Sequence, residues 1–386
     1  LPQYIQILKK LVNLVIILMS FMAKLKRNNS RKLNNFYLNL AFEQAKINLG
    51  FTKKNPSVGC VIEKNGSIIS SGITSLNGRP HAEYNALNKN LNFKGANMFV
   101  TLEPCSHYGK TPPCTNIIKR KGIKRVFYSF NDVDPRSKDK ANKVLKKKKI
   151  ITKNNLMSKF GKNFYESYTR QHNLNLPLID GKIAISKDYF TISKKNKWIT
   201  NEHSRKIGNF LRSNYNCILS TAKSINKDNS VLNCRIPGLE NRSPDLVIID
   251  RKLTLKKNLK IFSNKINRKI IIVTSKMDKK KQKWFKNKNI KLIYLKSMLT
   301  KSDFNQVFQK LFVKGYNRIF IEAGLTFVNY LVINKFINNL YVFSSHVKLK
   351  KVGYNNVSNK FLKKMKFRNK VNINLGDNNL YKEKII

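Results

Sequence analysis

The sequence predicts an α/β protein with two domains. Strand-like segments alternate with amphipathic helical segments along the chain, which is typical of sheets covered by helices. At 386 residues, the chain suits two domains of roughly 150 to 200 residues each better than a single core. A polar stretch ends near residues 172–176, where the apolar segment LPLIDGKIAI (176–185) begins. We therefore expect a first domain over 36–172 and a second domain over 176–386.

In the first domain, the apolar spacing predicts helices, a hairpin and strands in alternation. One helix is expected from the spacing of Leu38, Ala41, Phe42, Ala45 and Leu49, and Gly50 ends it. Alternating residues predict a strand over 57–63, and Asn65-Gly66 predicts a hairpin turn into the next strand. Further helices are expected at 81–89 and 115–122, and further strands at 97–102 and 124–130.

The second domain is predicted mainly from short, continuous apolar runs. Helices are expected at 201–213 and 325–335. Strands are expected at 216–220, 245–250, 269–274, 291–295, 318–323 and 340–345. The lysine runs at 146–149 and 279–283 are most simply interpreted as solvated surface.

The N-terminal segment is expected to lie outside the fold. Residues 11–23 are apolar, but this length is short of the roughly 20 residues that a membrane-spanning helix needs. A basic run, AKLKRNNSRK, follows, and Met22 stands just before it in a chain that begins with Leu. No convincing signal-peptide cleavage site is present. We expect residues 1–35 to form an extra or disordered arm, and we expect no membrane partner.

The charge of the chain is strongly positive. Lys and Arg number 77 against 20 Asp and Glu, which gives a formal net charge of +57. Such an excess is found in nucleic-acid-binding proteins. The lysines, however, are scattered and interleaved with Asn and Ile, a pattern that fits a drift towards AT-rich codons at least as well as a binding face. Either origin attracts anionic substrates, phosphates above all.

Cysteine usage points to a reducing compartment. Five cysteines, at positions 60, 105, 114, 217 and 234, are an odd number in a long chain without a convincing secretory signal. Reduced thiols are expected rather than a disulfide framework, and the expected location is the cytoplasm.

One group of residues has the composition of a catalytic zinc site. The segment RPHAEYNAL (79–87) places His81 two residues before Glu83, and TLEPCSHYGKTPPC (101–114) follows with Cys105 and Cys114. One imidazole and two thiolates suit Zn²⁺ with its fourth position open. Such a zinc ion lowers the pKa of water to about 7. Glu83, which is not a ligand, would then transfer protons, as in the zinc deaminases.

These segments resemble a known family. NPSVGCVIEKNG, GRPHAE and TLEPCSHYGKTPPC are similar to the deaminase half of the bifunctional deaminase/reductase of riboflavin biosynthesis, over about residues 36–172. Eight residues separate Cys105 from Cys114, whereas cytidine, cytosine and tRNA-adenosine deaminases usually have two. The resemblance implies a cytidine-deaminase-like αβα sandwich with Glu83 as the catalytic residue and one zinc ion bound by His81, Cys105 and Cys114. It also implies that Asn55 contacts the pyrimidine, and that His107, Lys110 and Thr111 face the ribose phosphate. Thr74 departs from the His that is common in the family.

The second half resembles the reductase of the same family, a dihydrofolate-reductase-like α/β domain that uses NADPH. Segments LPLIDGKIAISKD, KWIT, FLRSNYNCILS, KDNSVLNCR and IEAGLTFVNYL occur in the family's order. The resemblance implies that Lys182 lies on a strand followed by a turn with Ser186 and Asp188. The substrate-binding residues it implies are Asn196, Arg212, Leu232, Arg235 and Glu322. The NADPH-binding residues it implies are Ala184, Trp198, Ser224, Asp228, Arg251, Gly324, Leu325 and Thr326.

The reductase half departs from the family pattern at several positions. Tyr189 follows Asp188 where Gly is usual, STAKS (220–224) replaces a Gly-rich turn, and Asn229-Ser230 replaces Asp-Pro. Arg251 stands where Ser is common. A chain with deaminase activity alone and a degenerate reductase domain therefore remains an alternative.

The function that the resemblance implies joins two reactions on one chain. Hydrolytic deamination of diaminohydroxyphosphoribosylaminopyrimidine is followed by NADPH reduction of the product's ribose to a ribityl chain. The expected partner is this phosphoribosyl pyrimidine, and the family resemblance also implies a homo-oligomer. Nucleic acid is not expected as a partner, although a nucleic-acid deaminase, or a basic RNA- or membrane-binding protein with a structural zinc, remains an alternative.

Overall fold

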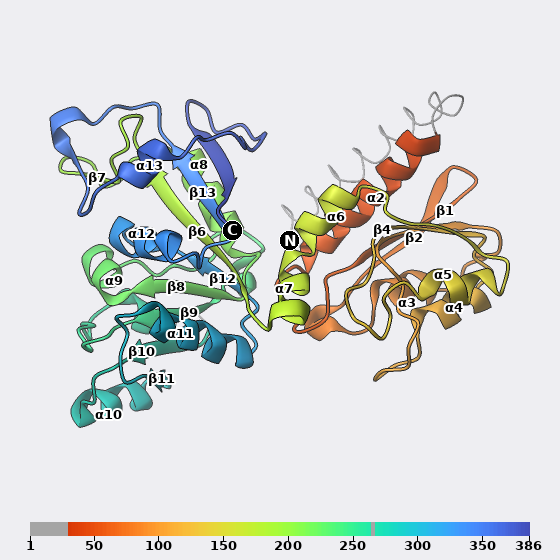
Figure 1. The fold of residues 1–386 in the computed structure, drawn as a ribbon, viewed down its shortest axis with the longest axis horizontal. Coiled ribbons are helices and arrows are strands. Elements are labelled where there is room, and N and C mark those ends of the chain that lie inside the picture. The colour runs from red at the N-terminus through yellow and green to blue at the C-terminus, as the bar shows by residue number, and fades with distance from the viewer. Residues whose placement is uncertain (1–29, 264–266) are drawn as a thin grey trace. The chain divides into compact units, whose positions relative to one another are not determined.

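The computed structural model describes residues 30–263 and 267–386. The chain divides into two compact units between Leu174 and Asn175 (Figure 1). Among the described helices, none is both long enough and apolar enough to cross a membrane.

The first unit is built on a five-stranded mixed sheet. Its strands follow the order β2 (Ser67–Ile73), β1 (Gly59–Lys64), β3 (Asn97–Leu102), β4 (Arg125–Phe130) and β5 (Ile151–Lys153). Strand β1 runs antiparallel to β2 and β3, whereas β3, β4 and β5 are parallel. The parallel arrangement brings the C-terminal ends of β3 and β4 to one edge of the sheet.

Helices cover both faces of this sheet (Figure 1). Helix α2 (Ser30–Ile47) packs Tyr37, Leu38 and Ala41 against strand residues Val61, Phe99 and Phe127. Alternate residues of the same strands, including Ile62, Met98 and Val126, face the opposite layer. That layer contains α3 (Ala82–Leu87), α4 (Cys114–Arg120) and α5 (Ala141–Lys146), and the unit ends with α6 (Ser158–Phe164) and α7 (Glu166–Leu174). The unit is therefore an αβα sandwich.

The predicted N-terminal arm is too long by several residues. Helix α2 begins at Ser30, so residues 30–35 belong to the fold and not to an arm. Leu33 packs against the cluster formed by Tyr37, Phe99 and their neighbours, which explains why this first part of the helix is ordered with the domain. Residues 1–29 lie outside the described residues.

The second unit contains an eight-stranded sheet. Its strands are β11 (Lys291–Tyr294), β10 (Ile270–Thr274), β9 (Asp245–Ile249), β8 (Cys217–Thr221), β12 (Arg318–Ile321), β6 (Leu178–Ile185), β13 (Asn339–Ser344) and β15 (Asn379–Lys384), in spatial order. The strands from β11 to β13 are all parallel, and β15 is antiparallel to β13. A separate pair joins β7 (Ile192–Ser193) to β14 (Gly353–Tyr354).

Both faces of this sheet are buried, as a parallel sheet requires. One face packs against α11 (Lys301–Val313) and α12 (Leu325–Ile333) through residues such as Phe308 and Val328. The other face packs against α9 (Ala222–Asp228) and α10 (Lys279–Asn287) through Ile225 and Phe285. Helices α8 (Glu202–Arg212) and α13 (Lys360–Lys364) complete the unit.

Candidate functional site

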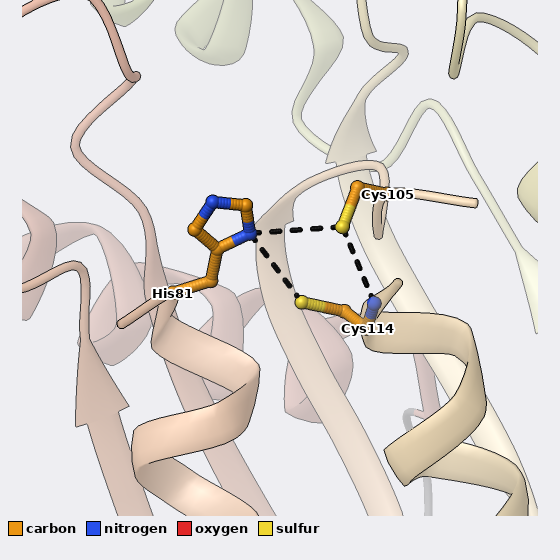
Figure 2. A group of neighbouring side chains, drawn as sticks. All are labelled: His81, Cys105 and Cys114. Carbon is orange, nitrogen blue, oxygen red and sulfur yellow. Dashed lines mark hydrogen bonds between the residues drawn. The ribbon is translucent and has the colours of Figure 1, made fainter. Parts of the chain in front are cut away.

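The three predicted zinc ligands lie together at the edge of the sheet where β3 ends (Figure 2). His81 precedes the first residue of α3, Cys105 follows β3 and its loop residue Pro104, and Cys114 is the first residue of α4. Three separate elements therefore each contribute one side chain. Their ligand atoms all lie within 4.8 Å of one another.

The spacing of these atoms fits a tetrahedral zinc ion. His81 Nδ1 lies 3.6 Å from Cys105 Sγ and 3.5 Å from Cys114 Sγ. Ordinary Zn–N and Zn–S bond lengths of about 2.1 and 2.3 Å at tetrahedral angles place such atoms about 3.5 Å apart. The donor set and its geometry thus fit Zn²⁺ with three protein ligands and a fourth position for water or substrate.

The environment of Cys105 favours a thiolate, whereas the hydrogen bond with Cys105 and burial raise the pKa of the Cys114 thiol. Hydrogen bonds from Cys114 and His81 lower the pKa of Cys105 to about 4, against the opposing effect of burial. The backbone amide of Cys114 also donates to Cys105 Sγ at 3.2 Å. A thiolate is the form of cysteine that binds metal.

Glu83 lies in the first turn of α3 and is only 4% exposed. Burial, and then the negative charge of Cys105, raise the pKa of its carboxyl to about 7. The carboxyl neighbours Cys114, one of the predicted ligands. A buried carboxyl beside a metal site can hold a proton near neutral pH, which is what a general acid–base requires.

The structure places the predicted substrate residues on two segments near the metal ligands. Asn55 is held by its Nδ2 atom, which donates to the carbonyl of Gly78 at 2.7 Å. His107, Lys110 and Thr111 lie on the loop that connects Cys105 to Cys114, with Lys110 and Thr111 exposed. Their roles in substrate binding stay predictions.

Two residues that the sequence did not indicate fix this loop. The buried hydroxyl of Ser137 lies 2.7 Å from His107 Nδ1 and accepts a longer bond, at 3.4 Å, from the amide of Ser106. Ser137 belongs to a segment gathered around the carboxylate of Glu103, which accepts the amides of Asp132, Asp139 and Ala141, each at 3.0 Å. Glu103 therefore supports His107 through Ser137. Its position directly before Pro104-Cys105 was the available sequence signal.

Thr74 has a structural role in this chain. Its side chain is buried, and its hydroxyl accepts the amide of Val58 at 3.0 Å. Its backbone carbonyl accepts a bond from Asn48 Nδ2 at 2.8 Å. The departure from His at this position thus supports the start of β1.

All the residues assigned to the reductase site line one cavity of about 1530 Å³ at the C-terminal ends of the strands of the second unit. This volume exceeds the range of about 300–1,000 Å³ that is typical for one small ligand, so the cavity has room for a dinucleotide together with a substrate. Basic side chains, among them Lys223, Lys227, Arg251, Lys252 and Lys260, also line it. The cavity therefore fits a phosphate-bearing dinucleotide such as NADPH.

Arg212 and Glu322 bind each other at this cavity. Arg212 Nε donates to Glu322 Oε1 at 2.5 Å, and Arg212 Nη2 donates to Glu322 Oε2 at 3.0 Å. Arg212 Nη1 is occupied by Asn209 Oδ1 and the carbonyl of Asn233. The substrate contacts that the resemblance implied for Arg212 and Glu322 thus compete with an ion pair already formed.

Lys182 lies beside this pair, where burial lowers the pKa of its ammonium against the attraction of Glu322. In the turn that follows the same strand, the Ser186 hydroxyl donates to Asp188 Oδ1 at 2.6 Å. The carboxylate of Asp188 also accepts the amides of Leu349 and Lys350, so this turn holds the segment after β13.

Two of the residues that depart from the family pattern have a positive φ. Tyr189 has φ 66°, the left-handed conformation that favours glycine, and Asn229, with φ 43°, ends α9 in the same region. In place of a Gly-rich turn, Thr221 caps α9 by accepting the amide of Ser224 at 3.3 Å. The Ser224 hydroxyl then accepts the amide of Gly324 at 3.1 Å. This bond joins the first turn of α9 to the residue that precedes α12.

Comparison with known proteins agrees with both halves of the chain. Residues 31–130 match the cytidine and deoxycytidylate deaminase zinc-binding region, and residues 179–347 match the RibD C-terminal domain. The riboflavin biosynthesis protein RibD of Bacillus amyloliquefaciens is 32% identical over 75% of this chain and 78% of its own length. The chain belongs to the RibD family. RibD of Aquifex aeolicus is 30% identical over 81% of this chain and 87% of its own length.

Solved structures of RibD proteins share the fold. The deaminase/reductase of Thermotoga maritima superposes with a TM-score of 0.76 at 25% identity, covering 93% of this chain and all of that one. RibD of Acinetobacter baumannii gives a TM-score of 0.74 at 23% identity, covering 92% of this chain. Family membership confirms the predicted fold class, and it confirms that a zinc deaminase domain precedes an NADPH-dependent reductase domain in a protein of riboflavin biosynthesis.

Proposed function

We propose that the first unit deaminates diaminohydroxyphosphoribosylaminopyrimidine and that the second unit reduces the ribose of the resulting aminouracil to a ribityl chain. The observation that carries the proposal is the cluster of His81, Cys105 and Cys114 at tetrahedral spacing, with the buried carboxyl of Glu83 beside it. The name of the Thermotoga maritima relative, which states these two activities, supports the choice of substrate.

In the deaminase, zinc bound by His81, Cys105 and Cys114 would supply Lewis-acid activation of water at neutral pH. Glu83 takes one proton from water and delivers protons to the pyrimidine ring nitrogen and to the departing amine. Its raised pKa suits both directions of transfer, because the carboxyl changes its protonation state near neutral pH. Water adds and ammonia leaves, so the step is a hydrolysis.

Binding of the substrate is assigned to groups around this cluster. Asn55 presents its remaining amide oxygen to the pyrimidine while Gly78 holds its nitrogen. Lys110, Thr111 and His107 receive the phosphoribosyl end. Ser137 fixes the ring of His107 through Nδ1 and leaves Nε2 for substrate.

In the reductase, NADPH would supply the hydride, and the protein supplies binding and orientation. We assign Ser224 and Gly324, at the starts of α9 and α12, to the cofactor phosphates, since helix N-termini favour anions. The Arg212–Glu322 pair and Lys182 form a fixed charged wall for the substrate end of the cavity. The convergence of all the assigned residues on one cavity favours an active reductase over a degenerate domain.

We also propose cytoplasmic action as a homo-oligomer. The cysteines of the described chain are all free thiols, which suits a reducing compartment. The family membership of the chain favours an enzyme over a basic RNA- or membrane-binding protein.

One two-step assay on the purified, zinc-loaded chain tests the proposal. The absorbance of the diaminopyrimidine phosphoribosyl substrate is followed first without NADPH, and NADPH is then added and its oxidation recorded. Deamination followed by NADPH oxidation is the expected result. Deamination without oxidation would leave the reductase assignment without support, and absence of deamination would remove the main proposal.

A further inference from the structure

Arg79 lies at the deaminase site, two residues before the ligand His81. Its Nη1 atom donates to the hydroxyl oxygen of Thr111 at 2.5 Å, across 32 residues of sequence. The side chain is partly buried, so a fixed cation stands beside the loop between the two cysteine ligands.

Gly109 brings this cation close to His107. A Cβ atom at Gly109 would lie 3.6 Å from Arg79 Nη2 and 3.7 Å from His107 Nε2. Both nitrogens therefore approach the same point of the loop. His107 Nδ1 is already taken by Ser137, so Nε2 is the ring nitrogen that remains for another partner.

The charge of Arg79 is not neutralised by the described part of the chain. Within residues 30–263 and 267–386, no carboxylate oxygen lies within 4.0 Å of its guanidinium. Arginine keeps its charge at every physiological pH, and its planar fork matches the oxygens of a phosphate. An unpaired arginine beside a hydroxyl and an imidazole has the composition of an anion site.

The bond between Arg79 and Thr111 leaves the Thr111 hydroxyl as a hydrogen-bond donor. Guanidinium nitrogens can only donate, so the Thr111 oxygen is the acceptor in this bond. The hydroxyl hydrogen of Thr111 then remains to be donated to another acceptor. A phosphate oxygen next to Thr111 would receive this hydrogen and, at the same time, the charge of Arg79.

We propose that Arg79 is a further substrate-binding residue of the deaminase, which recognises the substrate's phosphate together with Thr111 and His107. The inference rests on the proposed function, because it concerns the phosphoribosyl substrate of that same site. It adds specificity: the phosphorylated nucleotide is preferred over the free riboside because of one arginine beside the metal-binding histidine.

The test compares Arg79→Gln and Arg79→Lys with Arg125→Gln as a matched control. Arg125 is an exposed arginine at the start of β4, the end of the strand opposite to the site. For each zinc-loaded full-length protein, deamination is measured with the phosphorylated substrate and with its dephosphorylated riboside. Zinc content and competitive inhibition by inorganic phosphate are measured in parallel.

For Arg79→Gln, we expect KM for the phosphorylated substrate to rise about 10-fold or more, the loss of one charge-assisted contact. We expect kcat to stay within about 2-fold, the riboside reaction and zinc content to be unchanged, and phosphate to inhibit less. Arg79→Lys keeps the charge but loses the fork, so its KM should rise less. Arg125→Gln should behave as wild type.

If Arg79 only stabilised the loop and did not bind phosphate, the kinetic results would differ. Equal losses with both substrates, or loss of zinc in both Arg79 variants, would overturn the inference. So would an unchanged KM in Arg79→Gln when the wild type is active. If the wild type itself deaminates neither compound, the proposed function fails, and that outcome is separate from a failure of Arg79 alone.

Discussion

The hydroxyl oxygen of Ser137 lies 2.7 Å from Nδ1 of His107. Ser137 is fully buried, and His107 belongs to the partly exposed loop between the two cysteine ligands. A buried serine thus sets the ring orientation of His107, a residue assigned to substrate binding.

Ser137→Ala should weaken substrate binding with little effect on chemistry. Removal of the hydroxyl frees the imidazole of His107 to rotate, and one hydrogen bond contributes about 1 kcal/mol. We expect KM for deamination to rise about 3- to 10-fold, with kcat and zinc content unchanged. Ser129→Ala serves as the control, because Ser129 is equally buried and bonds to the carbonyl of Met157. An unchanged KM in Ser137→Ala would show that His107 needs no such support.

Glu103→Gln should destabilise the first unit. The glutamine amide would face at least one of the backbone N–H groups of Asp132, Asp139 and Ala141 that now donate to the carboxylate. Hydrogen bonds to a charged group contribute about 1.5–3 kcal/mol each, so we expect a loss of about 2–4 kcal/mol in unfolding free energy. Calorimetry of the zinc-loaded chain measures it. Glu43→Gln, at an exposed carboxylate paired with Lys46, should leave the unfolding temperature nearly unchanged.

Asp132 should make the stability of the first unit depend on pH. Burial raises the pKa of its carboxyl from 3.8 to about 6. The folded state therefore binds this proton more tightly than the unfolded state, and the resulting stability is present below pH 4 and is lost as pH rises through 6. Asp132→Asn removes the titration and keeps an oxygen for the hydroxyl of Tyr168, which donates to Oδ1 at 2.9 Å.

Relative to wild type, Asp132→Asn should gain about 2 kcal/mol of unfolding free energy between pH 4 and pH 7. Denaturant titrations of both proteins at these two pH values measure the difference. Parallel stability profiles would contradict the assigned pKa.

Substitution of only one member of the Arg212–Glu322 pair should lower the unfolding free energy of the second unit strongly. Both side chains are only 10–11% exposed, and removal of one partner of a buried pair typically costs about 3–5 kcal/mol. Glu322→Gln, which also leaves Lys182 without its attracting charge, should destabilise the second unit and slow NADPH oxidation without affecting deamination.

Arg212→Leu combined with Glu322→Leu should lose less stability than the two single variants added together. A double-mutant cycle based on denaturant unfolding measures this coupling. Additive losses would mean that the two side chains do not stabilise each other, although their atoms are in contact.

The strands were predictable where both sheet faces are buried. Strand β3 spans the predicted residues 97–102, and β9 and β10 are continuous apolar runs within the predicted ranges, as parallel strands covered on both sides should be. Predicted strand 318–323 ended two residues late, because β12 ends at Ile321.

The helices and strands that were not predicted differ in how clearly the sequence indicates them. Helix α11 has Phe304, Val307, Phe308 and Leu311 at helical spacing after a capping box of Thr300 and Asp303, so the pattern was present in the sequence. The lysine run 279–283, interpreted as solvated surface, is largely exposed, and the helix α10 to which it belongs was not predicted. Strand β15 is largely polar, and it pairs with β13 along its whole length.

Some residues of the candidate site could likewise be predicted from the sequence, and others could not. The predicted zinc ligands His81, Cys105 and Cys114, which the structure brings together, could be chosen from residue types and spacing, since the chemistry restricts which side chains can serve. Ser137 and Arg79 contact residues 30 or more positions away in sequence, and no local pattern marks such contacts. Tyr189 shows a third case, because its φ of 66° keeps a turn that its residue type alone would not predict.

The role of Glu83 is tested by the deamination rate of Glu83→Gln at a measured zinc content. We expect one zinc per chain in both wild type and variant, because Glu83 is not a predicted ligand. We expect a rate at least about 1,000-fold below wild type, because the variant cannot transfer protons. A variant that binds zinc equally and deaminates at a rate near that of the wild type would show that Glu83 is not the catalytic proton carrier.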